Sequence, residues 1–319
     1  MIKINIVWVG CHEEGVATFH SLLKIGCNIT RFITLNDESF NKRSGSSREY
    51  IGFCKDYNVP ISLVSSIKDD EAYEIIQDSH PDLMIVLGWS EILPEKLLDI
   101  PTIGTVGAHA SFLPHGRGSA PVNWSIINGE EMGGNSLMWL DKEVDKGNII
   151  DQIAFDITPY DTCKTVYEKV SETNRIMLLR LIDRLSNGLP TVMNKHNVTD
   201  EELLPRRRPK DGLLDWDRPS RKVYDFIRAL ARPYPGAFSF LEGKKYKIWS
   251  ASLLPINKME VENGTVVGPV ICPTEDSCGW MVACSMGYVI LHELEDEEGN
   301  VYKGKSLIDL HINGRFTNE

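Results

Sequence analysis

The sequence lacks the features of several large protein classes. No apolar run approaches the roughly 20 residues that a helix needs to cross a bilayer, so we expect no contact with a membrane. The first residues, 1–10, form a strand-like pattern without the basic segment and cleavage site of a signal peptide, and we expect a cytoplasmic protein. The seven cysteines form no Cys-x-x-Cys pair and the sequence has no ligand spacing for a metal. This pattern predicts reduced thiols and no metal site.

Surplus positive charge is also missing. Residues 1–205 hold 18 lysines and arginines against 29 aspartates and glutamates, so this part carries the whole net charge of −11. Residues 206–319 hold 16 side chains of each sign. Because nucleic-acid binding depends on surplus cations, neither part favours such a partner. The local exception is the run Arg206–Arg208, followed by Lys210, which is more typical of a solvated linker.

Strand and helix patterns alternate in the first 190 residues. Strands are predicted at 2–9, 29–34, 61–64, 83–87, 103–108, 135–140 and 149–156. Helices are predicted at 14–25, 47–57, 72–79, 95–98 and 162–186. This alternation predicts an α/β domain with a mostly parallel, twisted sheet and helices on its faces.

A second, smaller domain is predicted beyond a change of composition at 204–212, where Pro205 and Pro209 bracket the arginines. A short helix pattern at 223–230 is followed by short strand patterns at 238–241, 246–251, 264–270, 279–283 and 288–291. Several short strands within about 90 residues are typical of a small β-barrel. We therefore predict an α/β domain over 1–203, a linker over 204–212 and a β-barrel-like domain over 213–319.

The first turn that follows a strand, residues 10–15, is flanked by glycines but does not predict a nucleotide site. Its sequence, Gly-Cys-His-Glu-Glu-Gly, is not the Gly-x-Gly-x-x-Gly pattern that accommodates a pyrophosphate. The two glutamates, Glu13 and Glu14, would also repel the phosphate charges at the start of the following helix.

The densest group of chemically useful residues lies between positions 107 and 147. His109 ends a predicted parallel strand, and ligands of open α/β sheets bind at the carboxyl ends of such strands. A histidine transfers protons near neutral pH, and a carboxylate beside it, such as Asp145, can orient or charge it. Taken alone, a histidine at the end of a strand is more often a structural residue.

The same segment resembles a known family. Residues 109–114 (His-Ala-Ser-Phe-Leu-Pro), 117–121 (Arg-Gly-Ser-Ala-Pro) and 145–150 (Asp-Lys-Gly-Asn-Ile-Ile) are similar to the signature of the 10-formyltetrahydrofolate-dependent formyltransferases. In that family the blocks read Asn-x-His-x-Ser-Leu-Leu-Pro, Arg-Gly-x-x-Pro and Asp-x-Gly-x-Ile. Three blocks of the second part, at 211–216, 227–229 and 235–238, are similar to the C-terminal domain of the methionyl-tRNA and aminosugar formyltransferases. The resemblance thus covers the whole chain.

The resemblance implies a Rossmann-like catalytic domain that moves a formyl group from the co-substrate 10-formyltetrahydrofolate to a primary amine. It implies that His109 handles protons and stabilises the oxyanion, and that Asp145 tunes this histidine. It maps the folate pocket onto two loops, Ser90, Glu91, Ile92 and Leu93, and Asp141, Lys142, Glu143 and Val144. Arg117 and Trp124 are candidates for contacts with the acceptor, while a loop cap and a core aromatic are the alternatives for them.

One position departs from the family pattern. Gly107 stands two residues before His109, where the family has an asparagine that stabilises the oxyanion. Loss of such a donor lowers the rate by about 10²–10³. We hypothesise that Asn135, on a neighbouring strand, supplies the missing amide; the alternative is that Asn135 only bonds the backbone. A catalytically silent folate-binding relative and a formyltetrahydrofolate hydrolase are the other readings of the same residues.

Two kinds of acceptor are compatible with the resemblance. Methionyl-tRNA formyltransferases usually carry a basic loop after the second strand, whereas residues 35–50 here hold three cations and three anions. The segment 204–211, with its three arginines, is more similar to the aminosugar formyltransferases, which act on nucleotide-linked 4-amino sugars. We therefore predict a small, nucleotide-linked amine as the acceptor and expect no nucleic acid, with initiator tRNA kept as the alternative. A homodimer is also left open.

Overall fold

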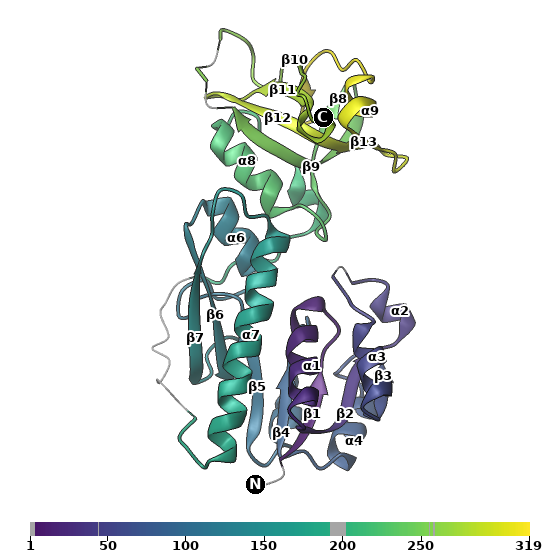
Figure 1. Ribbon diagram of the computed structural model, residues 1–319, viewed down its shortest axis with the longest axis vertical. Coiled ribbons are helices and arrows are strands. Elements are labelled where there is room, and N and C mark those ends of the chain that lie inside the picture. Colours follow the sequence, from purple (N-terminus) through teal and green to yellow (C-terminus); the bar gives the residue numbers. More distant parts are fainter. Residues whose placement is uncertain (1–3, 44, 192–201, 255, 258) are drawn as a thin grey trace. The chain divides into compact units, whose positions relative to one another are not determined.

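A computed structural model of the chain describes residues 4–43, 45–191, 202–254, 256–257 and 259–319 (Figure 1). The chain divides into two compact units. Unit 1 comprises Met1–Pro121, Met132–Asp156 and Tyr167–Pro205. Unit 2 comprises Val122–Glu131, Ile157–Val166 and Arg206–Glu319. The main division thus falls within the predicted linker, and unit 2 also takes two short segments from the region before it.

Unit 1 contains a seven-stranded sheet in the order β3-β2-β1-β4-β5-β6-β7. The strands are β1 (Asn5–Val9), β2 (Asn28–Leu35), β3 (Ile61–Val64), β4 (Leu83–Val86), β5 (Gly104–His109), β6 (Met132–Trp139) and β7 (Ile149–Asp156). Strands β1 to β5 pair in parallel, and β6 and β7 are antiparallel to their neighbours. This confirms the predicted mostly parallel sheet. Residues 2 and 3 of the first predicted strand lie outside the described residues.

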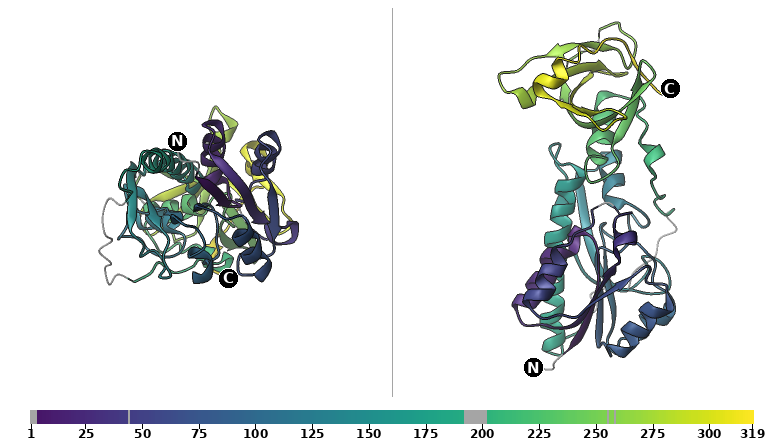
Figure 2. Two further views of the ribbon diagram at one scale, coloured as in Figure 1. Left: turned by 90° about the horizontal axis from the view of Figure 1, so that it is seen from below. Right: turned by 90° about the vertical axis from the view of Figure 1, so that its right-hand side faces the viewer.

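Helices cover both faces of this sheet. The helices of unit 1 are α1 (Val16–Lys24), α2 (Asp37–Phe40), α3 (Glu49–Asp56), α4 (Asp70–Asp78), α5 (Glu95–Leu98) and most of α7 (Cys163–Ser186). On one face lie α1, α3 and α7 (Figures 1 and 2). They bury Phe19, Tyr50 and Leu178 against the strands. On the other face, α4 and α5 bury Ile76 and Leu97. No helix in the described ranges is long and apolar enough to cross a membrane.

Unit 2 contains a second sheet in the order β10-β11-β12-β9-β8-β14, with β13 paired to β12, and every pairing is antiparallel. The strands are β8 (Ala237–Leu241), β9 (Lys244–Leu254), β10 (Val266–Val270), β11 (Gly279–Ala283), β12 (Tyr288–Glu295), β13 (Val301–Lys303) and β14 (Phe316–Thr317). A bridge between Thr265 and Arg315 joins the two edges of the sheet. This closure confirms the predicted β-barrel-like domain.

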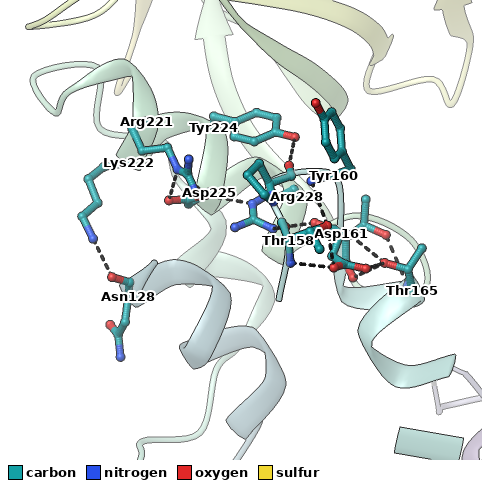
Figure 3. A network of polar contacts seen from close by, with 12 residues as sticks. Asn128, Thr158, Tyr160, Asp161, Thr165, Arg221, Lys222, Tyr224, Asp225 and Arg228 are labelled. Carbon is teal, nitrogen blue, oxygen red and sulfur yellow. Dashed lines mark hydrogen bonds and ion pairs between the residues drawn. The ribbon is translucent and has the colours of Figure 1, made fainter. Parts of the chain in front are cut away.

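The helices of unit 2 connect its distant segments. They are α6 (Pro121–Asn128), α8 (Ser220–Ala229) and α9 (Gly304–Ile308), with short 3₁₀ turns η2 (Pro209–Gly212) and η3 (Glu275–Ser277). Arg228 of α8 is 3% exposed and forms a 2.8 Å ion pair with Asp225, which is 1% exposed (Figure 3). The same guanidinium donates to the carbonyls of Thr158 and Asp161 at 3.0 and 2.6 Å. These bonds explain why residues 157–166 belong to unit 2.

Candidate active site

His109 is the last residue of β5, at the carboxyl edge of the parallel strands. Val86 of β4 pairs with Gly107, and Ser136 of the antiparallel strand β6 pairs with His109. The imidazole is 9% exposed. Its Nε2 lies 2.8 Å from the carbonyl oxygen of Gly116, and its Nδ1 lies 3.4 Å from Oδ1 of Asp145. The structure therefore brings His109 and Asp145 together, with the carboxylate placed to orient or charge the ring.

The carboxylate of Asp145 is held from its other oxygen. Oδ2 accepts a hydrogen bond of 3.0 Å from the backbone N–H of Gly118. Asp145 lies on the loop between β6 and β7, and its φ of +54° is a left-handed conformation that aspartate tolerates better than most residues. The loop is anchored at its start, where the N–H of Leu140 donates to Thr105 at 2.8 Å. One carboxylate oxygen is thus fixed by a backbone donor and the other faces the imidazole.

The loop after β5, residues 110–120, is fastened to the sheet by side chains. Ser136 Oγ accepts from the N–H of Leu113 at 3.0 Å and donates to the carbonyl of Ser111 at 2.7 Å. Gln152 of β7 donates to Ser136 Oγ at 2.9 Å and to the carbonyl of Leu113 at 2.8 Å. These bonds fix the backbone that presents the Gly116 carbonyl to His109.

Arg117 lies in the same loop and is 6% exposed. Its carbonyl accepts a hydrogen bond of 2.8 Å from the N–H of Leu204, and Gly118 forms a bridge with Leu204. A Cβ on Gly118 would lie 2.5 Å from the nitrogen of Leu204, and its φ is +112°, so only glycine fits. Contact of Arg117 with the acceptor stays a prediction.

The structure does not bring Asn135 to His109. Successive side chains of a strand point to opposite faces, and Ser136, not Asn135, lies opposite His109. The Asn135 amide is fully buried and donates to α7, to the Val170 carbonyl at 3.2 Å and to Asn174 Oδ1 at 2.7 Å. The expectation that Asn135 replaces the missing oxyanion donor is therefore corrected: the position fits a structural role between β6 and α7.

Another side chain fills the space that the family's asparagine would need. A Cβ on Gly107 would lie 2.8 Å from Cδ2 and 3.1 Å from Cδ1 of Leu140. Leu140 packs beside Leu113 and Met138, on the face of the sheet that carries His109. The Leu140 side chain therefore requires a glycine at position 107.

The first predicted folate loop is held in place by a charged network. Glu91 forms a 3.1 Å ion pair with Arg43 and accepts hydrogen bonds of 2.9 Å from Ser66 Oγ and the N–H of Ile67. Arg43 also donates to Ser90 Oγ. The Glu91 carboxylate is thus neutralised by Arg43 and hydrogen-bonded within the protein. The groups of this loop that can contact a ligand are therefore its backbone and its apolar side chains.

The remaining predicted folate residues differ in exposure. Leu93 belongs to the core, whereas Ile92 and Val144 are 62% and 42% exposed. Asp141, Lys142 and Glu143 are exposed. Asp141 and Lys142 also line a pocket of about 450 Å³ at the start of β5, at the opposite end of that strand from His109. Binding of folate by these loops stays a prediction.

Trp124 belongs to unit 2. It lies on α6, half-buried, with the guanidinium of Arg207 4.9 Å from its ring centroid. Arg207 also lies 5.2 Å from the ring of Phe226 and donates to the carbonyl of Asp211. Burial lowers the pKa of Arg207. Within the arginine run, Arg207 is therefore packed on aromatic rings, and a contact of Trp124 with the acceptor stays a prediction.

The sequence did not reveal that two titratable groups after β1 have shifted pKa values. Burial raises the pKa of Glu14 to about 7, against a lowering hydrogen bond from the backbone of Gly88. Burial also raises the pKa of the Cys11 thiol to about 12, so this cysteine is no thiolate nucleophile at neutral pH. The sequence signal for Glu14 is its place in the turn that follows β1 at the carboxyl edge of the sheet.

Comparison with known proteins gives consistent matches. Residues 36–182 match the family model "Formyl transferase", and residues 207–311 match "Formyl transferase, C-terminal domain". A methionyl-tRNA formyltransferase of Geotalea uraniireducens is 30% identical over 298 residues, which cover 93% of this chain and 92% of that protein.

Solved structures share the fold. HypX from Aquifex aeolicus in complex with tetrahydrofolic acid has a TM-score of 0.64 at 16% identity, covering 95% of this chain and 46% of HypX, so the chain spans about half of that protein. WlaRD, a sugar 3N-formyl transferase solved with dTDP and 5-N-formyl-tetrahydrofolate, has a TM-score of 0.62 at 18% identity over 94% of this chain and 100% of that one. With both family models matched and a relative 30% identical over nearly the whole of both chains, this chain belongs to the formyl transferase family and is a formyl-transferring enzyme.

Proposed function

We propose that this enzyme transfers the formyl group of 10-formyltetrahydrofolate to the primary amine of a nucleotide-linked aminosugar. The formyl donor is supported by the family and by two structural neighbours solved with tetrahydrofolate compounds. The acceptor is argued from the charges of this chain, because relatives that share the fold act on different amines according to their names.

The observation that carries the acceptor is the charge balance of residues 35–50. Each of the three basic side chains of this segment has a carboxylate partner: Lys42 with Glu38 at 2.8 Å, Arg43 with Glu91 at 3.1 Å, and Arg48 with Asp37. Paired charges cancel beyond a few ångströms, so the segment offers little attraction to a phosphate backbone. A nucleotide-linked sugar carries two phosphates and needs only one or two cations.

The chemistry follows from the contacts of His109. With Nε2 facing the Gly116 carbonyl and Nδ1 facing Asp145, the ring keeps one orientation. In our proposal, Nε2 exchanges its contact with the Gly116 carbonyl for one with the substrate. His109 then stabilises the developing oxyanion and carries a proton from the attacking amine to the leaving nitrogen, while Asp145 at Nδ1 offsets the positive charge of the ring. Because Gly107 and Leu140 leave no amide at the family's asparagine position, His109 takes a larger share of this stabilisation.

Methionyl-tRNA is the second candidate acceptor. It is favoured by the relative from Geotalea uraniireducens, which bears the name methionyl-tRNA formyltransferase and matches over more than nine-tenths of both chains. Its binding would depend on surplus cations elsewhere than residues 35–50, and would weaken steeply with salt.

Release of tetrahydrofolate from 10-formyltetrahydrofolate tests the proposal. The purified protein is assayed with a panel of nucleotide-linked 3-amino and 4-amino sugars, with charged initiator tRNA, and without any amine. We expect release that depends on one of the sugars and is little changed between 50 and 200 mM salt. Dependence on the tRNA instead would overturn the sugar assignment, and equal release without an amine would indicate hydrolysis.

A further inference from the structure

Two cysteines of unit 2 lie at the two ends of one hairpin loop. Cys272 follows β10 and Cys278 precedes β11, and these antiparallel strands end with Val270 paired to Gly279. Opposed residues of such strands have Cα atoms about 4.5–5.5 Å apart. Continued by one residue, the register sets Cys278 opposite residue 271, beside Cys272. The fold therefore brings the two cysteines close together.

The sulfur of Cys278 contacts the backbone of Cys272 directly. Sγ accepts a hydrogen bond of 3.2 Å from the N–H of Cys272 and lies 3.5 Å from the carbonyl oxygen of the same residue. The Cα of Cys272 is bonded about 1.46 Å from that nitrogen, so it lies within about 4.7 Å of the sulfur. Disulfides join residues whose Cα atoms are about 4.4–6.8 Å apart. The two sulfurs can therefore meet by rotation of the side chains, without rearrangement of the strands.

The backbone around Cys278 is held by further bonds. Its N–H donates to the Glu275 carbonyl at 3.0 Å, and its sulfur lies 3.7 Å from the Thr274 carbonyl. On the other side, Nδ1 of His292 lies 3.0 Å from the Cys278 carbonyl. These contacts keep the thiol of Cys278 beside Cys272 in the reduced protein.

The other cysteines compete poorly for an oxidant. The thiolate is the form of a cysteine that reacts, and burial disfavours it. Burial raises the pKa of the thiols of Cys11, Cys54 and Cys163 to about 12, and it also raises the pKa of Cys27. Cys284 is fully buried. Oxidation should therefore be directed to the hairpin loop of unit 2.

We propose that Cys272 and Cys278 form a reversible disulfide with a small oxidising disulfide, such as glutathione disulfide, as the oxidant. Cys272 is partly exposed and Cys278 is only 7% exposed, so the thiolate of Cys272 attacks one glutathione sulfur and releases the other glutathione. The thiolate of Cys278 then attacks the sulfur of Cys272, and the second glutathione leaves. Two protein thiols are thereby oxidised and one glutathione disulfide is reduced to two glutathiones. This modification site lies outside the reaction centre of unit 1.

The disulfide cross-links the turn on which α9 packs. A Cβ on Gly304, the first residue of α9, would lie 3.2 Å from the Cβ of Glu275. The cross-link also reduces the conformational freedom of the unfolded chain. The oxidised protein should therefore unfold at a higher temperature than the reduced protein.

The test equilibrates the full chain in glutathione buffers from fully reduced to fully oxidised. We expect the wild type to lose two thiols and the mass of two hydrogens, with the bridge mapped by peptide masses to Cys272 and Cys278. Its unfolding temperature should rise by a few degrees and return with dithiothreitol. Cys278→Ser should stop with one glutathione on Cys272, and Cys272→Ser should react about tenfold more slowly or less. Cys27→Ser, the matched control on a half-buried cysteine of unit 1, should behave as the wild type.

The wild type alone decides the inference. If it keeps all its thiols, or stops at a stable glutathione adduct, the proposed disulfide does not form. A bridge that maps to any other pair of cysteines would overturn the inference as well. Formation of a bridge in Cys278→Ser at the wild-type rate would also contradict it, because Cys272 would then have another partner. Circular dichroism of the reduced variants checks that both serine proteins are folded.

Discussion

The buried ion pair of unit 2 and the imidazole–carboxylate pair of unit 1 use similar groups for different ends. Arg228 and Asp225 lie 2.8 Å apart at 3% and 1% side-chain exposure, and the guanidinium also reaches two backbone carbonyls (Figure 3). His109 and Asp145 lie 3.4 Å apart at 10% and 11% exposure, at the edge of a sheet. The first pair is closed to ligands and joins segments distant in sequence. The second is looser and partly open, which a group that must exchange protons requires.

The largest effect is expected from removing the imidazole. His109→Ala should lower kcat about 10³-fold, equivalent to about 4 kcal/mol, because it removes both the proton carrier and the oxyanion partner. The unfolding temperature should fall less than the activity does, because the two partners of the imidazole, the Gly116 carbonyl and Asp145, lie in loops at the edge of the sheet. The measurement is steady-state release of tetrahydrofolate together with thermal unfolding. His115→Ala, on the exposed part of the following loop, is the control, and equal losses in both variants would contradict the assignment.

For the buried ion pair of unit 2 we expect the opposite result, a loss of stability. Asp225→Asn should lower the free energy of unfolding by about 3 kcal/mol, because it leaves the Arg228 charge buried without its partner. Denaturant unfolding measures the loss, and hydrogen exchange should show faster opening of residues 157–166. Lys222→Met is the control, since it removes one exposed bond of the same helix, to the Asn128 carbonyl. Loss of stability no greater than in this control would show that the buried pair contributes little.

Because burial shifts the pKa of Glu14, its effect on stability should depend on pH. Its folded-state pKa of about 7 lies above the unfolded value of 4.5, so the folded protein loses stability as pH rises from 4.5 through 7. At pH 8 the buried charge costs about 3 kcal/mol. Glu14→Gln should therefore be more stable than the wild type at pH 8 and similar to it at pH 4. Denaturant unfolding at the two pH values measures this, and a difference independent of pH would refute the burial of the charge.

The sequence predicted most elements of both domains and missed five. The predicted ranges of β3, β7 and β11 equal the observed ones, whereas α2, α6, α9, β13 and β14 were missed. These are short elements or, for α6, a helix that begins within a loop motif. Their stability comes from tertiary packing rather than from their own pattern.

Site residues at the ends of strands could be predicted from the sequence. Residues whose position depends on the register between two strands could not. His109 was found because β5 ends there, and the family motif supplied Asp145. Asn135 was placed wrongly because a shift of one residue moves a side chain to the other face, and the pairing of Ser136 with His109 is not readable from either strand alone. The fit of Leu140 against Gly107 was equally hidden, since it joins residues 33 positions apart.

The smallest effect should come from the exposed ion pairs of unit 1, which complete the comparison. Lys42 and Glu38 lie 2.8 Å apart but their side chains are 69% and 82% exposed, so water and salt screen their attraction. Lys42→Ala should leave thermal unfolding unchanged and alter turnover of an aminosugar nucleotide less than twofold. The assay is run at 50 and 200 mM salt, with Lys222→Ala as a control on unit 2. A loss of tenfold or more with charged tRNA, growing at low salt, would mean that this pair opens to hold a phosphate backbone, and the acceptor would then be the nucleic acid.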